Sequence, residues 1–138
     1  MVDIVITAAD IKGTPDATGI CAVGATIAAG EVVANDANGA IVLADANGGT
    51  GATNVLRKPI GIALNAATAG QPVGYVRPGK ALTVSAVLTA GTDYWLSGTP
   101  GKIAPRADVA AGMTPVLVGL AKSTTSLDVV LKSTEVQI

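Results

Sequence analysis

The strongest constraint on the fold is a regular alternation between short apolar runs and turn residues. Apolar side chains recur at every second position in runs such as 82–86 and 127–131. Clusters of Gly, Pro, Asn and Asp, such as GTPD, NDANG and SGTPG, separate these runs. A period of two places alternate side chains on opposite faces of a strand, and frequent turns between such runs are typical of small β domains. The pattern therefore predicts an all-β barrel or sandwich.

A weak internal repeat divides most of the chain into two β units. Residues 26–45, TIAAGEVVANDANGAIVLAD, resemble residues 87–108, VLTAGTDYWLSGTPGKIAPRAD. Both contain an Ala-Gly pair, a short apolar run, a Gly turn and an Ile-centred run. A further apolar run follows each copy, at 59–67 and at 115–123. Because two units are too few for a solenoid, the repeat predicts a single β domain over residues 20–138.

Residues 1–19 have the features of a flexible N-terminal arm. Val2, Ile4 and Ile6 alternate as in a strand, and the polar, turn-rich run DIKGTPDATG follows them. A loosely attached segment of this kind is suited to adding a strand to the sheet of a partner. We therefore expect Val2, Ile4 and Ile6 to contact a partner. A second exposed and mobile segment is expected at 44–54, which is rich in glycine.

Composition and charge favour a protein whose surface is partly covered by neighbours. Charged residues make up 14% of the chain, against about a quarter in an average domain. Such a surface exposes much apolar area and favours contacts with copies of itself or with a partner. The part before Arg57 carries one base and six acids, and the rest carries eight bases and four acids. These opposite charges can attract within one chain or between neighbours. The net charge of −1 gives no indication of a nucleic-acid partner.

The residue types that common catalytic and metal sites need are scarce. The chain has no His and one Cys, which excludes Ser-His and Cys-His dyads and the usual zinc sites. The run GYVRPGKA at 74–81 has the spacing of a phosphate loop. It lacks the final Ser or Thr, and the run after it predicts a strand where a helix is needed. The sequence therefore predicts neither an enzyme nor a metal or cofactor site.

Two further features indicate where the chain is made and how it packs. No run has the features of a signal peptide or a membrane span, so we expect synthesis in the cytoplasm and no membrane partner. Cys21 lies among apolar neighbours, and we expect its thiol to be buried and inert.

The only Trp lies beside one of the two Tyr residues, in the run TDYWLS. Neighbouring strand residues point to opposite faces, so one of Tyr94 and Trp95 must face the core. A core of small side chains leaves volume that one large ring can fill. We expect the other ring to contact a neighbouring subunit. The alternative is a glycan-binding face around an exposed Trp95.

Residues 59–132 resemble the head decoration proteins of tailed bacteriophages, which are also called cement or capsid-stabilising proteins. The resemblance lies in the stretches GIALNAATAGQPVGYVRPGKALTV, LTAGTDYWLSGTPGKIAP and VLVGLAKSTTSLDVVL. It implies a small β-tulip-like domain without enzymatic activity. It also implies a homotrimer on the outer capsid surface of the virion, at three-fold positions, with the phage major capsid protein as its partner. The alternative function is a host- or glycan-binding module of a phage fibre or spike.

Overall fold

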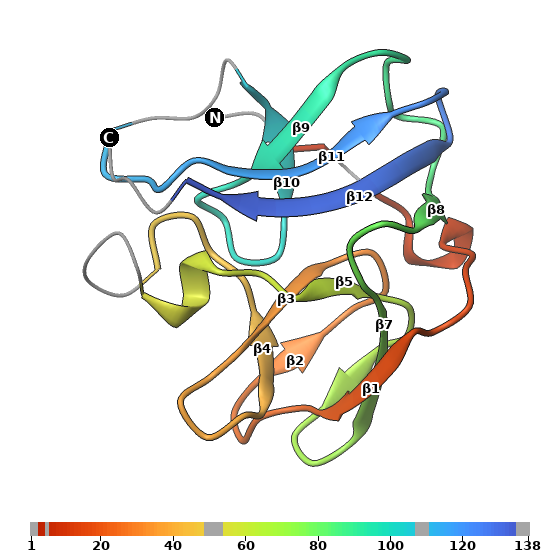
Figure 1. Cartoon of the computed structure of the whole chain (residues 1–138). Helices are drawn as coiled ribbons and strands as arrows, with labels where there is room; N and C mark the ends of the chain where they lie inside the picture. Colours follow the sequence, from red (N-terminus) through yellow and green to blue (C-terminus); the bar gives the residue numbers. More distant parts are fainter. Residues whose placement is uncertain (1–2, 5, 49–53, 107–110, 135–138) are drawn as a thin grey trace.

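The apolar runs form short antiparallel strands, and the all-β prediction is confirmed (Figure 1). The computed structural model describes residues 3–4, 6–48, 54–106 and 111–134. The strands are β1 (Ala17–Ile20), β2 (Thr26–Ile27), β3 (Val32–Asn35), β4 (Ile41–Leu43), β5 (Gly61–Ala63), β6 (Ala67–Thr68), β7 (Pro72–Val76), β8 (Ala81–Thr83), β9 (Asp93–Leu96), β10 (Ile103–Pro105), β11 (Val116–Ala121) and β12 (Ser126–Ser133). Two short 3-10 helices are η1 (Ala8–Asp10) and η2 (Val55–Arg57).

Two five-stranded sheets have the same connectivity. The first has the spatial order β1-β7-β5-β3-β4, and the second has the order β8-β12-β11-β9-β10. In the first sheet β1 lies beside β7, and β3 lies between β5 and β4. In the second sheet β8 lies beside β12, and β9 lies between β11 and β10. Counted along the chain, the first strand of each sheet therefore pairs with the fifth, and the second pairs with the third and the fourth. Every pairing within these two sheets is antiparallel. The two segments that resemble each other in sequence thus supply equivalent strands of the two sheets. The pair β2-β6 is an addition to the first unit.

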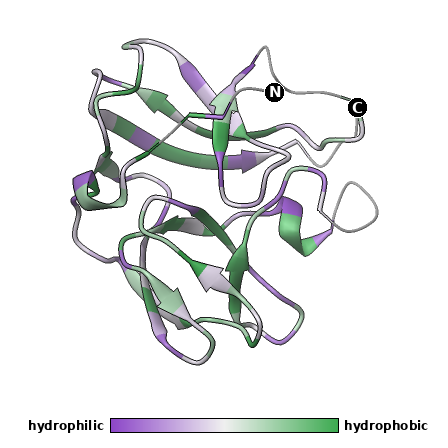
Figure 2. Ribbon diagram, turned by 180° about the vertical axis from the view of Figure 1, so that it is seen from behind, coloured by the Kyte–Doolittle hydropathy of each residue, from purple (hydrophilic) through white to green (hydrophobic). Residues whose placement is uncertain are grey.

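Two groups of buried side chains hold this arrangement together. The larger lies between the sheets and includes Val32 and Ile62 from the first sheet and Leu96, Val118 and Val129 from the second. The smaller lies on the other face of the first sheet. Figure 1 shows the two units stacked one above the other, and Figure 2 shows apolar segments along the strands of both. Because the larger core needs side chains from both sheets, the two units pack as one body. The β-tulip arrangement that the resemblance implies stays a prediction.

The first sheet curls until its two outer strands meet. Cys21, directly after β1, forms an isolated bridge with Ile41 at the start of β4. The amide of Ala22 donates a hydrogen bond to the carbonyl oxygen of Ile41 over 2.9 Å. The smaller core fills the space that this curl encloses, and the exposed fraction of Cys21 there is 2%. The first unit is therefore a small barrel, and the expectation that Cys21 is buried is confirmed.

The prediction of a loosely attached N-terminal arm is wrong for the residues that the structure describes. The amide of Ile4 donates to the carbonyl oxygen of Ile103 in β10 over 2.8 Å. Lys12 and Thr83 of β8 exchange two backbone hydrogen bonds of 3.0 and 3.1 Å. The segment therefore covers both outer strands of the second sheet. Its physical role is to pair N–H and C=O groups that an uncovered sheet edge would leave free. Residues 17–19 belong to β1, so the predicted boundary falls within a strand.

The side chains of this segment also pack on the domain. Ile4 and Ile6 are half-buried against the larger core. The amide of Thr7 donates to the hydroxyl oxygen of Ser85, a buried side chain, over 2.7 Å. Val2 lies outside the described residues. The two predicted contact residues that can be placed are therefore bound to this chain itself.

The glycine-rich run at 44–54 is also more buried than expected where it is described. Ala44 and Ala46 are fully buried and belong to the larger core. The Ala46 amide donates to the carbonyl oxygen of Ser97 over 3.1 Å, which ties the run to the second unit. Residues 49–53 lie outside the described residues. The prediction of an exposed loop is thus wrong for the start of this run, because small side chains fit where the two sheets approach closely.

Candidate functional site: the Trp95 face

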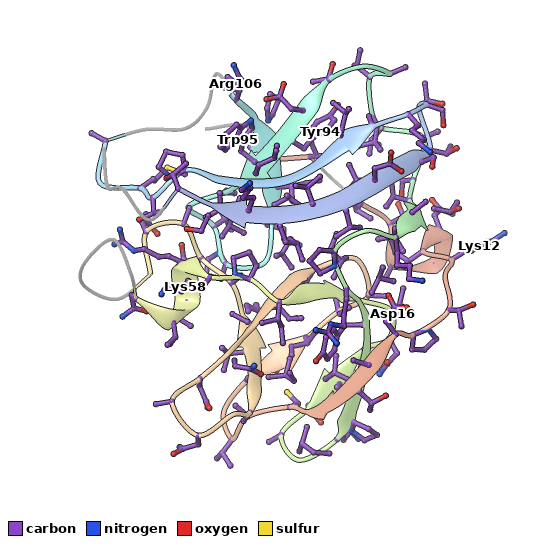
Figure 3. All side chains as sticks on the ribbon, in the orientation of Figure 1. Lys12, Asp16, Lys58, Tyr94, Trp95 and Arg106 are labelled. Carbon is purple, nitrogen blue, oxygen red and sulfur yellow. The ribbon has the colours of Figure 1, made fainter. Side chains whose placement is uncertain are left out.

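Strand β9 separates the two aromatic neighbours as the period of two requires. Tyr94 is 2% exposed in the larger core, and its hydroxyl oxygen accepts a hydrogen bond from the Thr89 amide over 2.8 Å. Trp95 points to the opposite, outer face of the sheet and is half-buried. Figure 3 shows Trp95 and Arg106 together on the upper sheet. The core ring is therefore Tyr94, and Trp95 is the ring available to a neighbour.

Trp95 is held by two charged neighbours. Its indole Nε1 donates to Oδ2 of Asp93 over 2.7 Å. The Arg106 guanidinium carbon lies 5.4 Å from the centroid of the indole ring, and its Nη2 is 2.8 Å from the same Asp93 oxygen. The indole hydrogen bond, with a smaller contribution from Arg106, holds the pKa of Asp93 below its ordinary value, against the opposing effect of partial burial. The three side chains form one preorganised cluster.

Apolar side chains continue from this cluster across the outer face of the second sheet. Leu117 of β11 pairs with Trp95, and Leu120 pairs with Asp93. The exposed fractions of Leu120 and of Val130 on β12 are 44% and 38%. We call the surface formed by Trp95, Leu117, Leu120 and Val130 the Trp95 face. Figures 1 and 2 show the second sheet above the first unit.

Charged groups border the Trp95 face. Asp93 and Arg106 lie at one side, and Lys122 and Asp128, whose charged atoms are 3.6 Å apart, lie at another. Interfaces between proteins commonly have an apolar, aromatic centre with Arg and a polar rim. The composition of this face is of that kind. It supplies contact area and direction, and no group on it is placed for covalent chemistry.

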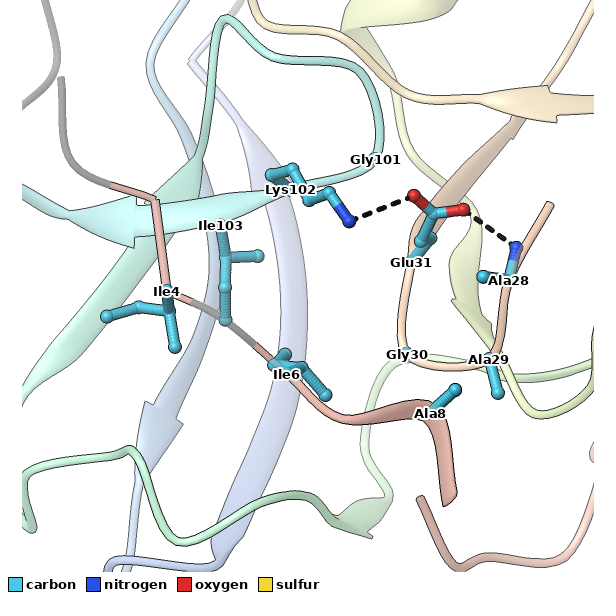
Figure 4. Close-up of a pocket in the computed structure, with 10 residues that line it drawn as sticks. All are labelled: Ile4, Ile6, Ala8, Ala28, Ala29, Gly30, Glu31, Gly101, Lys102 and Ile103. Atoms are coloured by element: carbon cyan, nitrogen blue, oxygen red, sulfur yellow. Dashed lines mark hydrogen bonds and ion pairs between the residues drawn. The ribbon is translucent and has the colours of Figure 1, made fainter. Parts of the chain in front are cut away.

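A small cavity lies beneath the N-terminal segment (Figure 4). Its volume is about 50 Å³, and Ala, Gly and Ile form most of its wall. Its acid and base bind each other, because Lys102 Nζ lies 3.3 Å from Oε2 of Glu31. The other Glu31 oxygen accepts the Ala28 amide over 2.7 Å. This pair joins the acidic first part of the chain to the basic second part, and it leaves the cavity without a free polar group of either residue.

Arg57 is a buried cation that sequence reasoning did not single out. It is 3% exposed, and its Nε donates to the carbonyl oxygen of Gly48 over 2.9 Å. Its Nη1 donates to Oγ1 of Thr114, in the second unit, over 3.0 Å. These bonds tie η2 to the segment before β11. Nothing in its immediate sequence marks it, because its partners lie far away in the chain.

Comparison with known proteins does not add a family. No family model matches this chain, and no curated protein matches it in sequence. Among the described residues, no group of His, Cys, Asp and Glu side chains is arranged to hold a metal ion. No helix in the described part of the chain is long and apolar enough to cross a membrane.

Proposed function

We propose that this chain is a structural protein of the virion that decorates the outer surface of a phage capsid. In this proposal it forms a homotrimer at three-fold positions and stabilises the contacts between major capsid proteins. The observation that carries the proposal is the Trp95 face, an apolar and aromatic surface with a charged border on a rigid sheet. The sequence resemblance over residues 59–132 supplies the identity of the partner.

The Trp95 face is the surface through which one copy contacts the next. Trp95 is fixed by Asp93 and Arg106, so little conformational freedom is lost when a neighbour covers the ring. The oppositely charged residues at the border favour a defined orientation of the neighbouring copy. Each trimer then binds several capsid subunits at once. Its binding free energy favours the assembled shell over separated subunits, and this effect is repeated at every site.

The Ile4 and Ile6 side chains do not serve as capsid contacts in this proposal. They pack against the larger core of their own domain. Releasing this part of the segment would uncover the outer strand β10, to which the Ile4 amide is bonded.

The second candidate function is a host- or glycan-binding module, and the half-exposed indole of Trp95 beside a carboxylate favours it. Trp rings commonly stack on sugars, and Asp93 could accept hydrogen bonds from hydroxyl groups. However, the Arg106 guanidinium lies over the ring, and the Asp93 carboxylate already accepts bonds from Trp95 and Arg106. A sugar that stacked on this face of the ring would have to displace the guanidinium. The structure therefore favours a protein contact at this face.

Purified phage heads that lack the protein provide the test. We expect added protein to sediment with the heads and to raise the temperature at which they rupture. The double variant Leu120→Asp with Val130→Asp should lose the trimer and most of this effect. The matched control is Val23→Asp, because Val23 is 96% exposed in the first unit. Heads that are equally robust with and without the wild-type protein would contradict the decoration role.

A further inference from the structure

The first barrel carries a polar groove that is separate from the Trp95 face. The groove has a volume of about 360 Å³ and is lined by Asn35, Ile60, Tyr75, Arg77 and Pro78. Ile60 and Tyr75 also pack against the smaller core. The groove therefore borders the smaller core of the first barrel, and concave surfaces of this kind are frequent sites for small ligands. Its size lies within the range of about 300–1,000 Å³ that such ligands occupy.

The Tyr75 ring is held in place as one wall of this groove. Tyr75 lies on β7, directly opposite Ala17 on β1 and Ala63 on β5. At Gly61, an added Cβ would lie 2.5 Å from Cδ2 of Tyr75. The glycine thus leaves the space in which the aromatic ring rests against β5. The ring is half-buried, so part of it stays open to a ligand.

Among the described residues that line the groove, Arg77 is the one that carries a charge. In the described part of the chain, its exposed guanidinium makes no ion pair or hydrogen bond, and no acidic side chain lines the groove. Its backbone amide donates to Oδ2 of Asp16 over 3.0 Å, which anchors the strand end. Figure 3 shows Asp16 beside the start of β1. A free guanidinium is the side chain best suited to pair with a carboxylate through two parallel hydrogen bonds.

The other groups that line the groove could bind more of a ligand than a single carboxylate. The Asn35 amide and the Tyr75 hydroxyl can each donate and accept hydrogen bonds, as the hydroxyl groups of a sugar require. The Tyr75 ring, Ile60 and Pro78 supply apolar surface, which suits the C–H face of a sugar ring. We propose that this groove binds a saccharide unit that carries a carboxylate, with Arg77 on the carboxylate and Asn35 and Tyr75 on the hydroxyl groups. The site is independent of the proposed capsid role.

The test is an NMR titration of the isotope-labelled full chain with glucuronate, glucose and acetate. We expect glucuronate to shift the amide signals of Asn35, Tyr75 and Arg77 saturably, with a millimolar dissociation constant. Glucose and acetate should each bind about ten-fold more weakly, because each lacks one half of the recognised chemistry. Arg77→Gln should bind glucuronate and glucose equally. Lys12→Gln is the matched control, since it removes another exposed cation that does not line the groove and should leave glucuronate binding unchanged.

Three results would overturn the proposal. The first is the absence of saturable shifts at the groove with glucuronate. The second is acetate binding as tight as that of glucuronate, which would reduce the site to a carboxylate contact. The third is tighter binding of an acidic peptide at the same amides, which would assign the groove to a protein partner. Because Arg77 is exposed, the Arg77→Gln variant should fold, and an unchanged wild-type spectrum outside the groove checks this.

Discussion

Replacing Ile6 and Ile11 by Ala tests whether the N-terminal segment is part of the folded domain. Both side chains reach Gly30, where an added Cβ would lie 3.0 Å from an atom of each, and both pack against the larger core. A fully buried Ile→Ala change costs about 2–5 kcal/mol. For two half-buried side chains we expect about half of that each, or about 2–5 kcal/mol for the pair. In a domain of this size the melting temperature should fall by about 6–15 °C.

Thermal unfolding followed by circular dichroism measures this effect. The matched control is Ile20→Ala, because Ile20 is 53% exposed on β1, and its replacement should change the free energy of unfolding by at most about 0.5 kcal/mol. Hydrogen exchange gives an independent reading, since the amides of Ile4 and Lys12 are bonded to outer strands and should be protected. The double variant could instead have the melting temperature of the wild type, with free exchange of these amides. Residues 3–12 would then be a loosely attached arm, and the account of their pairing with the sheet edges would be contradicted.

Three further predictions follow from single side chains. Tyr94→Phe leaves the Thr89 amide without its buried acceptor and should lower the free energy of unfolding by about 1–2 kcal/mol in urea titrations. The pKa of Asp93 is lowered in the folded state from its ordinary value of 3.8. The stability that this carboxylate contributes is therefore present well above pH 3.8 and is lost as the pH falls through the folded pKa. Asp93→Asn should remove this acid-dependent loss from a series of melting curves. Burial raises the pKa of the Cys21 thiol, so labelling by thiol reagents should be slow until the chain unfolds, and immediate labelling would contradict the barrel closure.

The periodic features of the sequence predicted the fold class, because they report local geometry. The alternation in 127–131 falls wholly within β12, whereas that in 82–86 coincides with a strand only at its start, in β8. The repeat between 26–45 and 87–108 corresponds to equivalent strands of the two sheets. The same alternation required that one of Tyr94 and Trp95 be buried. The alternation could not predict whether Tyr94 or Trp95 is the buried ring, because that depends on which face of β9 packs against the first unit.

The errors concern contacts between residues that are far apart in the chain. Ile4 and Ile6 have the same alternation whether they pair with their own β10 or with a partner. The deciding fact, an uncovered edge at Ile103, lies about 100 positions away. Burial of Ala44 and Ala46 likewise depends on the approach of Ser97. The groove around Tyr75 and Arg77 was missed because its residues come from three separate stretches, and only the pairing of β3, β5 and β7 brings them together.

A reconstruction of decorated phage heads by electron cryo-microscopy tests the central claim most directly. The account predicts three copies around each three-fold position on the outer surface, with Trp95, Leu120 and Val130 covered by the neighbouring copy. The N-terminal segment should lie along β8 and β10 of its own chain, as in the isolated protein. Heads without bound protein, or single copies whose Trp95 face points to solvent, would contradict the account.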